Sequence, residues 1–236
     1  MNIYEIMGLP AAAWIDRVVA KKQFYDNGDL STADKKLFEH VEKIRWLFAL
    51  KTENTFIQPF SDGERDYPEI EVLEVNLREE KQLKRLSEVI MRAIPYPMLL
   101  FFRLGDKVQL HMGRLRQSQA DSERMTLTEV ESTAWLAEDD KFWQDMALNK
   151  MMAANFCVLN EAWFDAISKS HLSALSVAVE EISGDEAREK VARLQAIEQE
   201  MNSLRSQMKK ESQFNRKIEL NTRLQKLKRE QKSIME

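Results

Sequence analysis

The sequence predicts an α/β (α+β) fold: a mixed β-sheet with packed helices over residues 1–183, followed by a helical coiled-coil arm over residues 184–236. Two observations predict it. Up to residue 183, segments with strand-like and helix-like spacing of apolar residues are interspersed, which is typical of helices packed on a mixed sheet. From residue 186 onward there is no glycine or proline, and apolar residues recur in heptads.

The composition predicts a globular, cytoplasmic protein, with 44% hydrophobic and 31% charged residues. No apolar run approaches the roughly 18–20 residues that span a membrane, and the first ten residues lack the features of a secretory signal. The single cysteine, Cys157, cannot form an internal disulfide. Because it lies in an apolar run, we expect it to be buried rather than a nucleophile.

The first third of the chain is predicted to contain two helices and two strands. A short helix is expected from Pro10, and a second helix is capped by Ser31 or Thr32. The second helix has apolar residues at spacings of four and three, namely Leu37, Val41 and Ile44. It is expected to give way to a buried strand over 45–50. After turn-like residues 60–68, a β-branched, partly alternating run over 70–77 indicates the second strand.

The middle of the chain is also predicted to contain both helices and strands. Helix 79–93 is ended by Pro95 and Pro97, which also force extended backbone into the next strand. Gly105 and Asp106 form a two-residue hairpin turn. The remaining predicted elements are strands 98–104, 107–114 and 125–135 and helices 140–153 and 160–182. Residues 183–185 are predicted to break the last of these helices and to cap the first helix of the arm.

The arm contains two heptad seams whose registers do not match. The seams are Leu194, Ile197, Met201, Leu204 and Met208, then Leu220, Leu224, Leu227 and Ile234, with Gln231 in the remaining slot. The mismatch lies across 209–216, so the arm is either one long helix with a stutter or a hairpin of two helices. We favour the hairpin because the halves are similar in length. The seams could close within one chain or pair two chains in a homo-oligomer.

The arm is basic, whereas the rest of the chain is acidic. Residues 186–236 carry a balance of +5, and the remainder carries −9, within a net charge of −4. Lys209, Arg216 and Arg223 recur every seven residues, so on one helix they would share a face close to Lys226. These four residues are the candidate contacts to nucleic-acid phosphates. The alternative, which we favour, is that these residues form the solvated flank of a coiled coil and bind no nucleic acid. Only Phe214 and Asn215 could contact bases.

Familiar cofactor and metal motifs are absent from the sequence. The three histidines have no cysteine or histidine at metal-ligand spacing: His40, His111 and His171. The six glycines are isolated, which excludes a Walker-type loop and a dinucleotide fingerprint, and there is no Gly-x-Ser-x-Gly elbow. We therefore predict neither a cofactor nor a metal.

One group of acids is compatible with catalysis. A turn containing Asp62 and Asp66 leads into a strand that carries Glu71 and Glu74. Metal-dependent nucleases of the restriction-endonuclease type place an acid before one strand and an acid-x-lysine on the next, where the lysine helps to orient the attacking water. Here the lysine is missing after both glutamates. A degenerate relative that keeps the fold without the chemistry, or simply a solvated strand face, accounts for the acids better.

Six segments, in their order along the chain, resemble an uncharacterised bacterial family of about this length, known mainly as a domain of unknown function. These segments are AKKQFYDN (20–27), VEKIRWLFAL (41–50), TENT (52–55), the 70–77 strand, AIPYP (93–97) and QFNR (213–216). Members of that family often sit beside helicases and DNA methyltransferases in restriction or phage-defence loci. The resemblance implies a partner of that kind and assigns no catalytic residue.

The function we expect is that of a non-catalytic adaptor in a bacterial DNA-processing or anti-phage defence assembly. Its α/β body would dock on a helicase or methyltransferase subunit, and its arm would mediate dimerisation, partner capture or DNA contact. One alternative is a divergent metal-dependent nuclease that uses the acids named above. Another is a purely structural homodimer.

Overall fold

The computed structural model describes residues 2–27, 30–118, 125–151, 153–174, 182–211 and 213–235. The chain divides into two compact units, Met1–Ile167 and Ser168–Glu236. The first unit is built on a mixed seven-stranded sheet with packed helices, and the second contains long helices, which confirms the predicted fold class. In the described residues, no helix combines the length and the apolar character needed to cross a membrane.

The central sheet has the order β1-β2-β5-β6-β7-β8, and β9 also pairs with β7. Its strands are β1 (Trp14–Val18), β2 (Val41–Leu50), β5 (Ile70–Leu77), β6 (Met98–Leu104), β7 (Lys107–Gln117), β8 (Met125–Ser132) and β9 (Leu136–Ala137). Only the β5–β6 pair is parallel among the described strand pairs. Helix α5 (Leu83–Ala93) makes the crossover that a parallel pair requires. A separate hairpin pairs β3 (Phe60–Ser61) with β4 (Asp66–Tyr67).

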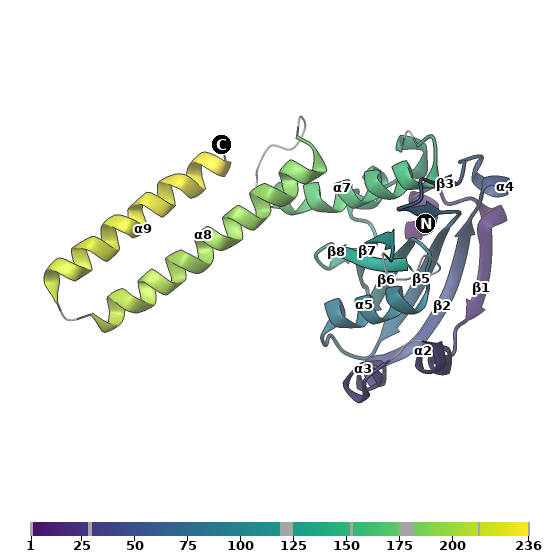
Figure 1. Ribbon diagram of the computed structural model, residues 1–236, viewed down its shortest axis with the longest axis horizontal. Helices are drawn as coiled ribbons and strands as arrows, with labels where there is room; N and C mark the ends of the chain where they lie inside the picture. Colours follow the sequence, from purple (N-terminus) through teal and green to yellow (C-terminus); the bar gives the residue numbers. More distant parts are fainter. Residues whose placement is uncertain are drawn as a thin grey trace. The chain divides into compact units, whose positions relative to one another are not determined.

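Helices cover both faces of the sheet (Figure 1). One face packs against α1 (Ile3–Ile6), α6 (Lys141–Asp145) and the start of α7 (Phe156–Ala174). The other face packs against α2 (Lys21–Asn27), α3 (Thr32–Leu37) and α5. We call these the α7 face and the α5 face. Because β5 and β6 are covered on both sides, their sequences are nearly continuous apolar runs rather than alternating ones.

The strands predicted in the middle of the chain are confirmed. β5 and β6 begin and end at the predicted residues. Gly105, at φ 62, turns the chain into β7, which extends three residues beyond the prediction. The α5 helix ends at Ala93 as predicted but starts at Leu83, because Gln82 adopts a left-handed conformation with φ 46.

The helix predicted from Pro10 is wrong. Residues 11–13 form a single 3-10 turn, and Trp14–Val18 is the edge strand β1, paired on one side with β2. The pairing register shifts between Trp14 and Arg17, and Asp16 within this bulge has φ 50. Pairing with a neighbouring strand has here overridden the local apolar spacing.

The second predicted helix is shorter than expected. Ser31 caps α3, which ends at Leu37, and after a 3-10 turn over Phe38–His40 the strand β2 begins at Val41. Val41 and Ile44 are therefore strand residues. The register of β2 shifts between Val41 and Lys43, so both side chains reach the α5-face core although they are three residues apart. This β-bulge imitates a helical spacing.

Three later predictions also need correction. The helix predicted over 140–153 is the short α6 followed by a 3-10 turn over Leu148–Lys150. The last helix of the body begins at Phe156 rather than at 160, and the part of its prediction over 175–181 lies outside the described residues. β8 ends at Ser132, three residues earlier than predicted.

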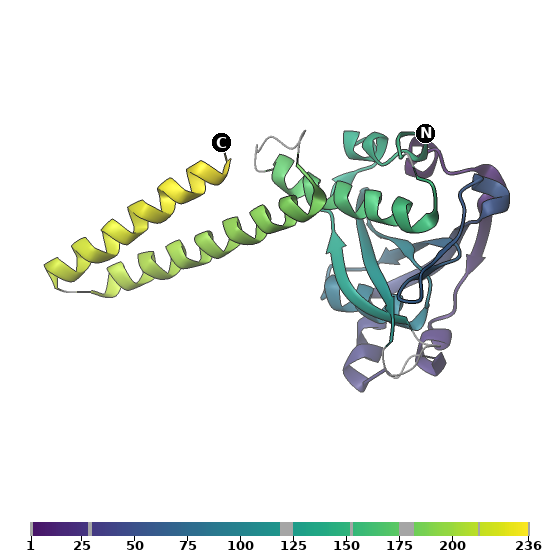
Figure 2. The same cartoon turned by 45° about the horizontal axis from the view of Figure 1, so that its top comes forward.

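The arm contains two helices, α8 (Gly184–Lys210) and α9 (Phe214–Met235), which run side by side (Figure 2). Ser183 caps α8 through a capping box with Glu186. The predicted apolar seam residues of the two helices, apart from Leu194, meet in one apolar cluster, in which Met201, Leu204 and Leu224 are buried. Leu194 packs instead with Leu172 and Ala187. Of the two alternatives, the structure therefore has the hairpin, with its seam closed within one chain.

Candidate functional site

Glu74 is the centre of a buried polar cluster on the α7 face. Its carboxylate accepts hydrogen bonds from the Tyr4 hydroxyl at 2.6 Å and from the Arg103 Nε at 2.5 Å, and Arg45 lies 4.0 Å away. Burial, together with the charge of Glu74, raises the pKa of Tyr4 well above its usual value. Arg103 is also bonded to Glu138. The cluster ties α1, β2, β5 and β6 together through one side chain.

Glu71 lies on the opposite face of β5. Its neighbours on that face, Leu73 and Val75, belong to the α5-face core, whereas Ile70 and Val72 belong to the α7-face core. The Trp46 Nε1 donates a hydrogen bond to the Glu71 carboxylate. Glu71 therefore shares no surface with Glu74, although only two residues separate them.

The environment of Glu71 favours its neutral form. The side chain is only 5% exposed, and burial, reinforced by nearby Glu69, raises its pKa to about 8. Glu69 itself forms an ion pair with Lys51 at 2.8 Å. A carboxyl group in this state is half protonated near pH 8, so it can donate or accept a hydrogen bond around neutrality.

The two aspartates predicted to complete a metal site lie on the β3–β4 hairpin. Asp62 accepts two hydrogen bonds from the Arg65 side chain, which hold the pKa of Asp62 below its usual value. Asp66 is exposed and pairs with Ser61 across the hairpin. Within the residues that the structure describes, no three histidine, cysteine or acidic side chains are grouped so as to hold a metal ion. The four predicted acids are thus spread over two sheet faces and a hairpin.

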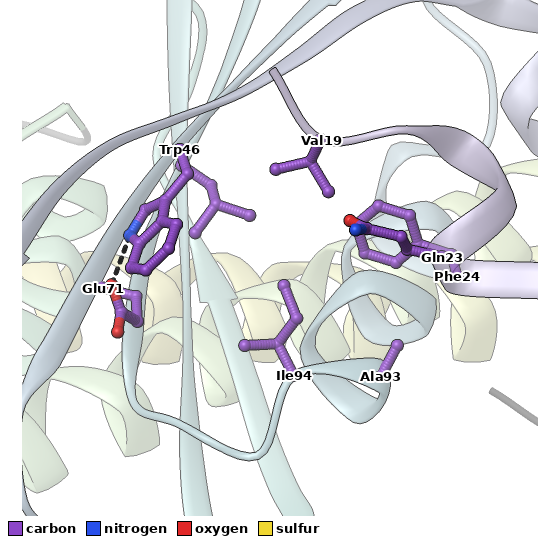
Figure 3. A pocket seen from close by; sticks show the side chains of 8 residues that line it. Val19, Gln23, Phe24, Trp46, Glu71, Ala93 and Ile94 are labelled. Carbon is purple, nitrogen blue, oxygen red and sulfur yellow. Dashed lines mark hydrogen bonds between the residues drawn. The ribbon is translucent and has the colours of Figure 1, made fainter. Parts of the chain in front are cut away.

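A pocket of about 330 Å³ opens beside Glu71 on the α5 face. It lies between the sheet, helix α2 and the carboxyl end of α5. Its other lining residues are Val19, Gln23, Phe24, Trp46, Leu73, Ala93 and Ile94. Figure 3 shows Trp46 and Glu71 at one side of the pocket and Gln23 and Phe24 at the other. Among the sequence-predicted site residues, Glu71 alone lines this pocket.

The four predicted DNA-contacting residues are all exposed on the helical hairpin. The hairpin separates Lys209, at the end of α8, from Arg216 in α9, so the seven-residue repeat does not place these two on one helix face. Arg223 is paired with Glu200 of α8 at 2.5 Å, and Arg216 lies 3.6 Å from Glu211. These arginines therefore carry internal ion pairs, as residues flanking a helical seam commonly do.

An exposed apolar edge was not anticipated from the sequence. Phe56 follows the short helix α4 (Thr52–Thr55), is 88% exposed and has a left-handed backbone with φ 62. Trp14, 47% exposed, lies at the start of the edge strand β1 and stacks edge-on against Phe48 near the end of β2. Both aromatic residues belong to the end of the sheet edge where α4 follows β2 (Figure 1).

Comparison with protein families gives a match, over residues 7–230, to the family described as "Domain of unknown function (DUF4391)". The chain belongs to the DUF4391 family. This confirms the predicted resemblance to a family of unknown function. No match was found among curated proteins or among solved structures.

The DUF4391 match runs through both units of the chain, so the helical hairpin is part of the family's domain. In this DUF4391 protein the single cysteine is buried as predicted, and burial raises the pKa of the Cys157 thiol. His111 is also buried, which lowers its pKa to about 3 and keeps the ring neutral. His40 lies beside Glu79, with its Nδ1 facing the Glu79 carboxylate.

Proposed function

We propose that this DUF4391 protein is a non-catalytic adaptor whose α/β body docks on a protein partner through the edge that carries Phe56 and Trp14. The partner implied by the family resemblance is a helicase or DNA methyltransferase subunit of a bacterial DNA-processing or anti-phage defence assembly. The observation that supports docking is the 88% exposure of Phe56. Large aromatic side chains are enriched at protein interfaces, where they fill pockets of the partner.

The backbone at Phe56 supports the same proposal. A left-handed conformation is unfavourable for a residue with a bulky side chain and costs about 1–3 kcal/mol. In α4 the Thr55 hydroxyl bonds to the Lys51 carbonyl, and the Phe56 amide bonds to the Thr52 carbonyl, so the turn is held by several contacts. This conformational cost is not offset by burial of the Phe56 ring within its own chain, since the residue is 88% exposed. A partner that encloses the ring would supply that burial.

The arm has a separate role in the proposal. Its apolar seam is already closed by α8 and α9, so what it presents outward is charge. The basic balance of this segment favours an acidic partner surface or nucleic-acid backbone. Lys209, Arg216, Arg223 and Lys226 are the residues proposed to contact DNA. Ile218, 49% exposed on α9, offers an apolar contact to a docked protein.

The experiment is a pull-down from the native host with tagged full-length protein, followed by mass spectrometry of the proteins retained. The variant is Phe56→Ser, and the matched control is Val18→Ser, which removes another exposed apolar side chain at the end of β1 away from Trp14. We expect the wild type and the control to retain the same helicase or methyltransferase subunit, and Phe56→Ser to lose it at an unchanged melting temperature. Equal retention by all three proteins would contradict docking through this edge.

A further inference from the structure

The pocket beside Glu71 is an apolar cavity with a single ionisable group. Its volume of about 330 Å³ lies at the lower end of the range for small-molecule sites, roughly 300–1,000 Å³. Among the described residues that line it, Glu71 is the only one that titrates, and Gln23 is the only other one with a polar end group. Small-molecule sites typically combine an apolar wall with a few polar groups that fix orientation.

Among the charges that act on Glu71, the acid Glu69 outweighs the base Lys51. Glu69 stands next to Glu71 and acts on it electrostatically, and Lys51, which is paired with Glu69, is the cation that acts in the opposite sense. Helix α5 ends at Ala93 in the pocket wall, so the partial negative charge of its carboxyl end adds to that of the acids. Arg92, in the last turn of α5, is exposed and lies 3.9 Å from Glu88 instead of lining the pocket.

We propose that this pocket binds a small organic cation, an ammonium group on an apolar body, with the ammonium held by the Glu71 carboxylate and the body packed against Phe24, Trp46 and Ile94. A buried carboxylate is costly to ionise unless a positive group compensates it, and an ammonium would supply that compensation. The flat Trp46 ring can also contact the cation through its face. This binding is independent of the adaptor function, since it needs neither Phe56 nor the arm.

The pocket wall favours a free small molecule over a lysine side chain of a protein. Phe24, Leu73 and Ile94 offer apolar surface that a slender lysine stem would cover only in part, whereas an aromatic or branched aliphatic body would fill it. A blocked lysine is therefore a useful comparison ligand. If it bound more tightly than an arylalkylamine, the site would recognise basic side chains and the proposal would be overturned.

Binding of such a cation must depend on pH in a defined direction. The ammonium selects the ionised form of Glu71, which is the minor form below pH 8. Affinity should therefore rise with pH by up to about tenfold per unit below pH 8 and level off above it, until the amine itself loses its proton. A neutral ligand of the same shape should show no such rise.

The test is isothermal titration of the full-length protein with 2-phenylethylamine, hexylamine and cyclohexylmethylamine at pH 6, 7 and 8.5. 2-Phenylethanol serves as the neutral isostere and Nα-acetyl-lysine amide as the blocked lysine. The first variant is Glu71→Gln, and its control is Glu42→Gln, which alters an exposed acid on β2. The second variant is Val19→Phe, which fills the pocket without touching its charge.

We expect at least one of the amines to bind the wild type and the control, more tightly at pH 8.5 than at pH 6. Glu71→Gln should weaken that binding at least tenfold at pH 8.5 and abolish its pH dependence, and Val19→Phe should abolish it at every pH. The proposal is overturned if none of the amines binds, if 2-phenylethanol binds as tightly as 2-phenylethylamine, or if Glu71→Gln leaves the affinity unchanged.

Discussion

Glu71 and Glu74 occupy the same strand yet lie on opposite faces of the sheet, one beside Trp46 and the other beside Tyr4. The alternation of side chains along β5 separates them, because residues three apart in a regular strand point to opposite sides. The two acids therefore have different roles. Glu74 is enclosed by an arginine and a hydroxyl, whereas Glu71 lines a pocket and favours its protonated form.

Replacing Glu74 by glutamine should destabilise the α/β body by about 3 kcal/mol, because Arg103 would lose the negative charge that compensates it in a largely buried setting. Urea unfolding at pH 7 measures the loss. The control Glu80→Gln alters an exposed acid and should change the free energy of unfolding by less than about 0.5 kcal/mol. Equal effects of the two substitutions would refute a structural role for the Glu74 cluster.

Replacing Glu71 by glutamine should change the pH dependence of stability. Folding raises the pKa of Glu71 from 4.5 to about 8, so the folded protein holds a proton that the unfolded chain releases. This group therefore makes the wild type less stable as the pH rises from about 5 to about 8. Glu71→Gln removes that loss, so its stability relative to the wild type should grow over this range and stay constant above it.

Urea unfolding at pH 5, 6.5 and 8 follows this difference. The Glu42→Gln control should keep the wild-type dependence, since Glu42 is exposed. If the curves for Glu71→Gln and the wild type ran parallel from pH 5 to pH 8, the pKa of Glu71 would not be raised.

Truncating Leu224 to alanine should open the helical hairpin. The side chain is 7% exposed in the seam between α8 and α9, so its loss should cost about 2–3 kcal/mol. Hydrogen exchange across α8 and α9 should accelerate by one to two orders of magnitude, since about 1.4 kcal/mol corresponds to a factor of ten. In the same helix, Ile218→Ala removes a half-exposed side chain and should leave exchange unchanged. Similar acceleration in both variants would count against a seam closed within the chain.

If the arm contacts DNA as proposed, neutralising its candidate residues should release the protein from a short duplex at low salt. Glutamine is the suitable replacement, because a glutamate at Arg223 would face Glu200. The variant changes Lys209, Arg216, Arg223 and Lys226 together, and the control neutralises Arg205, Lys217, Lys228 and Arg229. Fluorescence anisotropy should show binding lost in the first and largely kept in the second. Unchanged binding by the first variant would contradict DNA contact through these four residues.

The central strands could be predicted from the sequence because burial on both faces makes their apolar runs continuous. β5 and β6 are covered by helices on each side, so the sequence pattern and the structure agree from Ile70 to Leu77 and from Met98 to Leu104. The heptad seams of the arm could also be predicted from the sequence. The turn between α8 and α9 lies within residues 209–216, where the registers of the two seams do not match.

The failures have local physical causes. The edge strand β1 pairs with a neighbouring strand on one side only, so its sequence carries a weak strand pattern. The bulge in β2 puts Val41 and Ile44 on one face of the sheet at a spacing that is typical of a helix. The pocket could not be predicted, because the fold brings together residues from Val19 to Ile94 that share no periodicity. The exposure of Phe56 is only weakly indicated by the sequence, in which this aromatic residue directly follows the polar segment Thr52–Thr55.

The bulge at Asp16 also bears on how the protein behaves at high concentration. An open sheet edge can recruit a strand from another molecule and so seed fibres. In β1 the ladder is interrupted between Trp14 and Arg17, and Asp16, bonded to Arg45, places a charged pair where an incoming strand would have to align. Five residues with such an interruption are a poor template for further pairing. The sheet edge that carries the exposed Trp14 is thereby protected from uncontrolled self-assembly.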